Sequence, residues 1–214
     1  MPGKMLMMQY VFLHGLGQTP ASFESTIKEM KLDKECFCPD LSELLYGKEI
    51  TYNNLYDAFV TLCDQYSEQL NLCGLSLGGI LALNYAIDYP AKVKSIVLIA
   101  AQYKMPKALL SFQNWIFRFM PNSMFKSTGF GKEDFINLSK SMINLDFSNG
   151  LKNITCPVLV LCGDKDKANK KATDELSELI PKAEKHLIEN SGHEVNINAS
   201  KELAAILSKF YREI

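Results

Sequence analysis

The sequence lacks a strong charge of either sign and lacks any long apolar run. Its 214 residues carry 23 Lys and Arg against 24 Asp and Glu, a formal net charge of -1. That balance gives no reason to expect nucleic acid or a strongly acidic partner. No apolar stretch is long enough to span a bilayer, and the first residues are too strand-like for a secretory signal. We therefore expect a cytoplasmic protein without stable membrane insertion.

Paired metal ligands are also scarce in the chain. Most of the six cysteines lie within apolar segments, as buried reduced thiols do in cytosolic proteins. Cys36 and Cys38 are close together, but no second Cys or His pair occurs at ligand spacing. The pattern predicts a structural role for these thiols, with no metal and no cofactor. It leaves the oligomeric state open.

Strand and helix patterns alternate along most of the chain. Strands are expected over 7–13, 35–38, 71–75, 93–101, 158–162 and 183–188, and helices over 53–70, 77–89, 169–180 and at the C-terminus. A near-continuous apolar run such as 93–101 is typical of a strand covered on both faces. The alternation predicts an α/β fold with a mostly parallel sheet of about six strands and helices on both faces.

The segment between Gln102 and Lys152 interrupts this alternation. It contains no good strand pattern, but two apolar stripes at helical spacing: Leu109, Phe112, Ile116 and Phe119, then Phe135, Leu138, Met142 and Leu145. We expect a helical lid over 102–152, inserted after the strand at 93–101, with 1–101 and 153–214 forming the core. The lid has no acidic residue up to Lys132, which indicates a solvated basic surface or, alternatively, attraction of an acidic substrate.

A serine with a glycine two residues away on each side lies where an apolar segment stops and a helical pattern starts. The run is Gly74-Leu75-Ser76-Leu77-Gly78. Glycines at these positions allow a tight, strained turn from strand to helix that exposes the serine hydroxyl. The hydroxyl then lies over a helix N-terminus, where negative charge is favourable. This pattern predicts Ser76 as a nucleophile, which needs a base because a neutral hydroxyl reacts poorly.

Only three histidines are available as that base. His193 lies in a turn after the last expected strand, and loops at the carboxyl ends of parallel strands share one edge of the sheet. His186 lies inside a strand pattern, which predicts a structural or surface role. His14 follows the first strand, where its ring can hold a loop through backbone hydrogen bonds. His193 is therefore the expected general base.

The remaining parts of such a site are a carboxylate and two oxyanion donors. Asp164 and Asp166 both follow the strand at 158–162, and a carboxylate there can orient the histidine. Asp166 is favoured because it lies farther along the turn, whereas Asp164 can shape the backbone. The expected donors are the backbone N–H groups of Leu77 and Leu16. Loss of one such donor typically lowers the rate about 10²–10³-fold.

Four motifs in chain order resemble the α/β-hydrolase fold family: His14-Gly15, the serine turn, Gly163-Asp164-Lys165-Asp166 and Ser191-Gly192-His193. The resemblance covers nearly the whole chain. It implies a lid inserted after the strand that follows the nucleophile helix, where residues 102–152 fall. Larger members begin with an antiparallel strand pair, which we expect to be missing here. Serine at the turn argues against the dehalogenases and epoxide hydrolases of the family, which use aspartate there.

The resemblance implies a serine hydrolase that cleaves a carboxylic ester or thioester of a small, apolar acyl substrate through an acyl-enzyme intermediate. Lid side chains either wall an apolar acyl pocket or simply pack the lid on the core: Phe112, Trp115, Ile116 and Phe119. Two alternatives stay open. One is a lyase or carbon–carbon hydrolase with the same triad, whose polyanionic substrates favour arginines, of which the chain has only Arg118 and Arg212. The other is a non-catalytic small-molecule receptor.

Overall fold

The computed structural model describes residues 10–32, 35–107, 121, 125 and 129–214. Its strands form one six-stranded parallel sheet in the order β2-β1-β3-β4-β5-β6. Their bounds are β1 Tyr10–Leu13, β2 Cys36–Phe37, β3 Leu70–Leu75, β4 Val93–Ile99, β5 Val158–Gly163 and β6 Ala183–Ile188. The expected α/β fold with a parallel sheet is confirmed.

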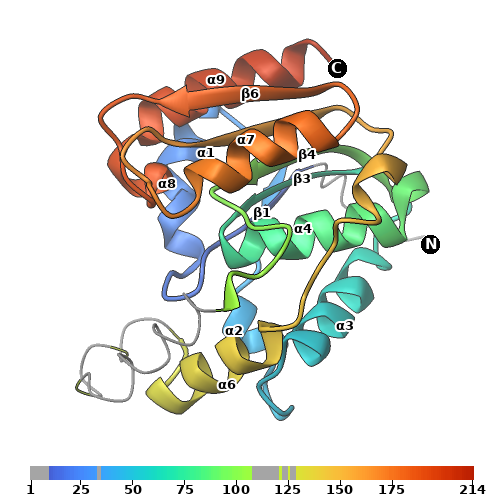
Figure 1. Cartoon of the computed structure of the whole chain (residues 1–214), viewed down its shortest axis with the longest axis vertical. Helices are drawn as coiled ribbons and strands as arrows, with labels where there is room; N and C mark the ends of the chain where they lie inside the picture. Colours follow the sequence, from blue (N-terminus) through green and yellow to red (C-terminus); the bar gives the residue numbers. More distant parts are fainter. Residues whose placement is uncertain (1–9, 33–34, 108–120, 122–124, 126–128) are drawn as a thin grey trace, which may run out of the picture.

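Helices cover both faces of this sheet (Figure 1). One face carries α1 (Glu24–Met30) and α9 (Ser200–Arg212), and the other carries α3 (Tyr52–Cys63), α4 (Leu77–Asp88) and α7 (Lys170–Leu179). The described residues also form short helices: α2 (Leu41–Leu44), α8 (Val195–Asn198), and 3₁₀ turns at Pro20–Phe23, Pro90–Lys92 and Leu151–Asn153.

The two-sided cover explains the apolar run of the central strand. In β4, Ile96 and Leu98 pack into the hydrophobic cluster under α3 and α4, whereas Val97 and Ile99 pack into the cluster under α1 and α9. All four side chains are fully buried. Successive residues of a strand point to opposite faces, so a strand buried on both sides needs apolar residues at every position.

Several boundaries differ from the sequence prediction, and tertiary structure or backbone conformation accounts for two of them. The helix expected over 53–70 ends at Cys63, because Leu70 is the first residue of β3 and pairs with Val93. Pairing in a buried sheet outweighs the helical spacing of Leu70. The strand expected over 93–101 ends at Ile99, because Ala100 has a left-handed backbone with φ of 48°.

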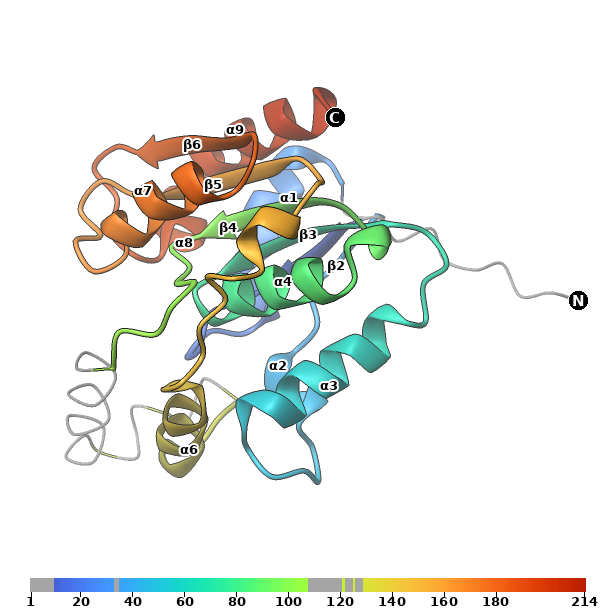
Figure 2. The same cartoon turned by 45° about the vertical axis from the view of Figure 1, so that its right-hand side comes forward.

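The described part of segment 102–152 contains α6 (Lys132–Met142), which corresponds to the second expected apolar stripe. Figure 2 shows α6 beside α3 and away from the sheet. The backbone N–H of Tyr52, at the start of α3, donates to Oγ of Ser141 at 2.8 Å. The two ends of the segment are joined where the N–H of Phe147 donates to the carbonyl of Tyr103 at 2.8 Å. Residues 108–120, which carry the first stripe, lie outside the described residues.

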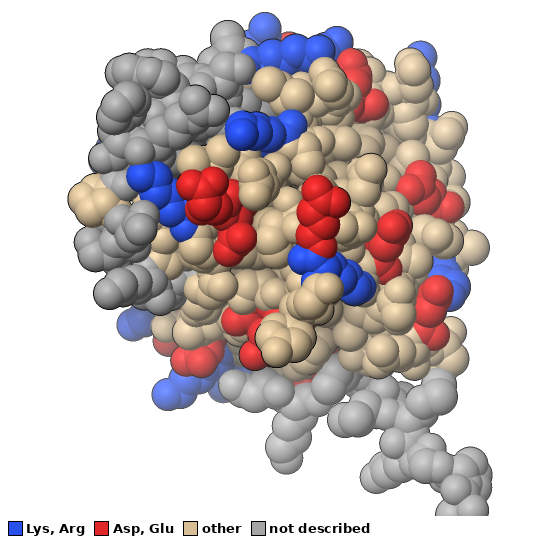
Figure 3. Space-filling view, turned by 90° about the horizontal axis from the view of Figure 1, so that it is seen from below, with Lys and Arg blue, Asp and Glu red and all other residues tan. Residues whose placement is uncertain are grey.

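None of the helices in the described ranges combines the length and apolar character needed to cross a bilayer. The view from below in Figure 3 shows acidic and basic side chains of the described residues intermixed. Two lysines of segment 102–152 have polar partners within that segment. Lys104 contacts Asp146 at 2.9 Å, and Nζ of Lys107 donates to Oδ1 of Asn144 at 2.9 Å.

Candidate active site

Ser76 lies between β3 and α4 with φ of 52° and ψ of -112°. A positive φ is uncommon for a residue with a side chain, and such strained positions cluster at functional sites. Backbone hydrogen bonds hold the conformation: the N–H of Ser76 donates to the carbonyl of Ile99 at 2.8 Å, and its carbonyl accepts from Ile80 at 3.0 Å. The serine is thus presented at the N-terminus of α4, at the carboxyl edge of the sheet.

The flanking glycines are required by close approach of the backbone. A Cβ atom on Gly74 would lie 2.2 Å from the carbonyl carbon and oxygen of Gly78. A Cβ atom on Gly78 would lie 2.1 Å from the carbonyl oxygen of Leu13 in β1. Separations this short are forbidden for real side chains, so any larger residue would push β1, β3 and α4 apart.

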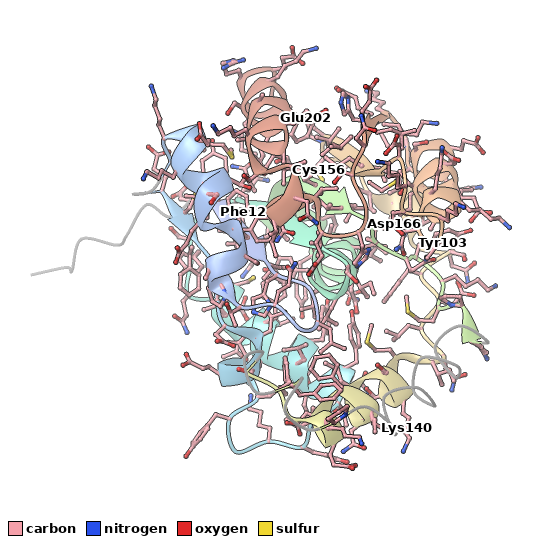
Figure 4. All side chains as sticks on the ribbon, turned by 90° about the vertical axis from the view of Figure 1, so that its left-hand side faces the viewer. Phe12, Tyr103, Lys140, Cys156, Asp166 and Glu202 are labelled. Atoms are coloured by element: carbon pink, nitrogen blue, oxygen red, sulfur yellow. The ribbon has the colours of Figure 1, made fainter. Side chains whose placement is uncertain are left out.

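His193 and Asp166 are joined by a direct hydrogen bond. Nδ1 of His193 lies 2.8 Å from Oδ2 of Asp166, and the two side chains are 41% and 5% exposed. Burial raises the pKa of Asp166, but hydrogen bonds from His193 and Asn169 outweigh it and hold that pKa below its ordinary value. Asp164, the other candidate, instead accepts from the backbone N–H of Ser191 at 3.2 Å. Figure 4 shows Asp166 in the loop that follows β5.

The loop carrying His193 runs from β6 across the carboxyl edge toward β1. Nε2 of Gln18, in the loop after β1, donates to Oε1 of Glu194 at 3.1 Å and to Oδ1 of Asn196 at 3.3 Å. The loop is therefore held to the β5 side through Asp166 and to the β1 side through Gln18. The end of β3, with Ser76, lies between these strands. No hydrogen bond joins Ser76 to His193 among the described residues, and such bonds are often long before substrate binds.

The turn after β1 presents the second expected oxyanion donor. The N–H of Gln18 donates to the carbonyl of Gly15 at 3.1 Å, and Oε1 of Gln18 accepts from the N–H of Gly15 at 3.2 Å. Gly17 has φ of 90°, which suits the third position of a tight turn. Within the described structure these bonds leave the N–H of Leu16 without a partner. Leu77 begins α4, and the first N–H groups of a helix have no partner within the helix.

The two other histidines lie elsewhere. His14 is fully buried; its Nε2 accepts from the N–H of Leu41 at 3.1 Å, and its Nδ1 donates to the carbonyl of Gly15 at 2.9 Å. Both ring nitrogens are therefore occupied. Burial lowers the pKa of His14, with the Gly15 hydrogen bond opposing it. His186 is exposed on β6.

An aromatic cluster lies beside the Leu16 turn. The ring of Phe135, from α6, lies 4.9 Å from that of Phe125 and 6.4 Å from that of Phe130. Cζ of Phe135 is only 3.3 Å from where a Cβ on Gly17 would stand. Four expected pocket residues lie outside the described residues: Phe112, Trp115, Ile116 and Phe119.

The described residues offer little to hold a polyanion or a metal at this edge. Arg212 ends α9, and Figure 1 shows the C-terminus on the side opposite the β6 arrowhead. Arg118 lies outside the described residues. Within the described ranges, no three His, Cys, Asp or Glu side chains are grouped so that they could hold a metal ion.

Sequence reasoning missed the carboxamides that surround these residues: Gln18, Gln102, Asn169 and Asn196. Asn169 lies three residues after Asp166, and its N–H donates to Oδ1 of Asp166 at 3.3 Å. An acid three residues before a polar residue at a helix start is a local signal that could have been used. The partners of Gln18 and Gln102 are distant in sequence, and no local pattern indicates them.

A comparison with protein-family models decides the family. The model described as the alpha/beta hydrolase family matches residues 10–206. The chain belongs to the alpha/beta hydrolase family. This membership agrees with the parallel sheet and supports a hydrolase.

Comparisons with single proteins found two relatives that are named as hydrolytic enzymes. A proline iminopeptidase of Heyndrickxia coagulans is 38% identical over 71 residues, which is 33% of this chain and 25% of that protein. A Yersinia enterocolitica protein with the provisional name carbamate hydrolase RutD is 23% identical over 181 residues, covering 70% of this chain and 65% of the relative. The chain therefore matches less than two thirds of the length of either relative.

A solved structure resembles nearly the whole chain. The enol-lactonase from Burkholderia xenovorans superposes with a TM-score of 0.81 at 16% sequence identity, covering 95% of this alpha/beta hydrolase and 91% of the enol-lactonase. At this identity the likeness establishes the common fold.

Proposed function

We propose that this alpha/beta hydrolase is a serine hydrolase that cleaves a carboxylic ester or thioester of a small acyl substrate. Ser76 is the nucleophile, His193 the general base and acid, and Asp166 the carboxylate that orients His193. The observation that carries the proposal is the 2.8 Å hydrogen bond between His193 and Asp166, at the sheet edge where Ser76 occupies its strained turn.

The proposed reaction proceeds through an acyl-enzyme. His193 Nε2 accepts the Ser76 hydroxyl proton as Oγ attacks the carbonyl carbon, and Asp166 stabilises the imidazolium through Nδ1. The N–H groups of Leu16 and Leu77 donate to the oxyanion of the tetrahedral intermediate. The imidazolium then gives its proton to the leaving alcohol or thiol. Water, deprotonated by His193, releases the acid and restores Ser76.

The proposed substrate has a small apolar acyl group. The aromatic cluster of Phe125, Phe130 and Phe135 supports this, because it lies against the turn that carries the Leu16 N–H. An acyl chain bound with its oxyanion at that N–H would contact these rings.

The first prediction tests the nucleophile. A fluorophosphonate probe should label the wild-type protein once, on Ser76, as read by peptide mass spectrometry. Ser76→Ala should lose labelling and lower kcat on p-nitrophenyl acetate about 10⁴-fold or more, because attack on the carbonyl then has no nucleophile. His193→Ala should slow labelling to a similar degree.

The matched control is Ser67→Ala, because Ser67 is an exposed serine in the loop before β3. It should label and turn over like the wild type. Wild-type protein that stays unlabelled, or labelling that persists in Ser76→Ala, would contradict the nucleophile assignment. Circular dichroism of each variant separates lost chemistry from lost folding.

A further inference from the structure

Asn169 holds both oxygens of the Asp166 carboxylate. Its Nδ2 lies 3.0 Å from Oδ1 and 2.9 Å from Oδ2, and its backbone N–H donates to Oδ1 at 3.3 Å. Asp166 is buried, so these bonds and the one from His193 replace the water that an exposed carboxylate would keep. The position of the carboxylate therefore depends on how the Asn169 side chain is turned.

Gln102 determines that orientation. A carboxamide presents a donor on one side and an acceptor on the other, and its partners decide which side faces where. Oδ1 of Asn169 accepts from Nε2 of Gln102 at 2.9 Å, and the same Nε2 donates to the carbonyl of Ala168 at 3.2 Å. Gln102 offers a donor to Asn169, so Asn169 turns its NH₂ group toward Asp166.

The orientation affects the tautomer of His193. Nδ2 of Asn169 is 3.2 Å from Nδ1 of His193, and both atoms lie within hydrogen-bond distance of Oδ2 of Asp166. In the arrangement observed, two donors converge on one carboxylate oxygen. When Nδ1 carries the proton of the neutral ring, Nε2 is unprotonated and can accept a proton. A reversed carboxamide would place its oxygen against the carboxylate, and the repulsion between the two would displace the oxygen that accepts the Nδ1 proton.

Gln102 also links this cluster to the segment that leaves β4. Gln102 and Tyr103 are its first residues, and Oη of Tyr103 donates to Oε2 of Glu175 in α7 at 3.0 Å. Figure 4 shows Tyr103 and Asp166 on these neighbouring segments. The first two residues of segment 102–152 thus both bond to the chain in and just before α7, and only Gln102 bonds to Asn169, the residue that holds the carboxylate.

We propose that Asn169 and Gln102 are positioning residues, a carboxamide relay that aligns Asp166 and thereby keeps the proton of His193 on Nδ1. The proposal deepens the proposed function and rests on it for its catalytic consequence. The alignment of the ring is a structural property and can be measured without any substrate.

The direct test is nitrogen NMR of the three histidines in ¹⁵N-histidine protein, with His193 assigned from His193→Ala. In the wild type, the neutral form of the His193 ring should carry its proton on Nδ1. Asn169→Ala and Gln102→Glu should shift the ring toward a mixture of tautomers, the second because a carboxylate cannot donate to Oδ1 of Asn169. Tyr103→Phe is the matched control. It removes the neighbouring hydrogen bond to Glu175 in α7 but leaves both carboxamides in place, so the wild-type spectrum should be kept.

The kinetic test uses p-nitrophenyl acetate and counts active sites by fluorophosphonate titration. Asn169→Ala and Gln102→Glu should lower kcat per titrated site about 10- to 100-fold, as expected for loss of a hydrogen bond to a charged group, with KM unchanged. In Asn169→Asp the loss should shrink toward acidic pH, because protonation of the introduced carboxyl restores one donor. A purely structural role would lower the fraction of active sites and the melting temperature instead.

Several outcomes would overturn the relay. These are a wild-type His193 spectrum in Asn169→Ala, an altered spectrum in Tyr103→Phe, or a kcat per site within twofold of wild type in both carboxamide variants. Failure of the proposed function is distinguishable, because wild-type protein would then neither label nor turn over the ester. The NMR comparison still decides the relay in that case.

Discussion

At the scale of single residues, histidine chemistry is set by the surroundings of each ring. His14 and His193 follow strands of the same sheet, yet His14 is fully buried with both nitrogens bonded to backbone groups. His193 is partly exposed and bonds through Nδ1 alone to a carboxylate. Among the described residues, the same side chain therefore has both ring nitrogens bonded to the backbone in one loop and only Nδ1 bonded to a carboxylate in the other.

The burial of the His14 ring predicts that the stability of the protein depends on pH. The folded pKa of His14 lies below its ordinary value of about 6.5, so the unfolded chain binds the proton more readily. The free energy of unfolding should be at its full value above that pH and should fall as pH drops below it. Protonation would also remove the acceptor for the Leu41 N–H.

The measurement is urea unfolding between pH 8 and 5. His14→Gln keeps an acceptor near the position of Nε2 but does not titrate, so its stability should vary less with pH than that of the wild type. His186→Gln, on the exposed surface of β6, should retain the wild-type slope. An unchanged slope in His14→Gln would show that another group controls the pH dependence.

At the scale of elements, the junction of β3 and α4 depends on the absence of side chains. Gly74→Ala would drive a Cβ to 2.2 Å from the backbone of Gly78, so strand and helix must separate. We expect a loss of about 3 kcal/mol or more in the free energy of unfolding, at the upper end of overpacking effects. Gly192→Ala is the control, because nothing lies within 4 Å of its Cβ position.

Urea unfolding of both variants tests this expectation. Gly192→Ala should stay within about 0.5 kcal/mol of the wild type, as surface substitutions usually do. Equal losses in the two variants would mean that the junction tolerates a methyl group and that close approach is not what selects glycine there.

At the scale of the whole molecule, the sheet separates two hydrophobic clusters that share its strands. Ile96→Val and Ile99→Val remove one methylene each from opposite faces of β4. Each should lower the free energy of unfolding by about 0.5–1.5 kcal/mol. The double variant should equal the sum within about 0.5 kcal/mol, because the two side chains share no cluster. Urea unfolding measures the three losses. A difference well above about 0.5 kcal/mol between the loss in the double variant and the sum of the single losses would indicate that strain passes through the strand.

Much of the fold could be predicted because its signals are local. The strand at 183–188 has the predicted bounds, and the turn at Ser76 follows from glycines at fixed spacing. The end of α3 could not be predicted, since Leu70 continues the helical spacing and only its pairing with Val93 assigns it to β3. The sequence favours Asp166 over Asp164 only through its place farther along the turn, and the contact with His193 agrees with that choice.

The sequence by itself determined the order of strands and helices, the parallel sheet and the strained serine, because residue spacing and glycine positions act over a few residues. Only the tertiary structure decided that the favoured carboxylate, Asp166, contacts His193 and which carboxamides lie around that contact. Those contacts join loops that follow β1, β4, β5 and β6. Their geometry depends on how the strands pack side by side, and no spacing along the chain encodes it.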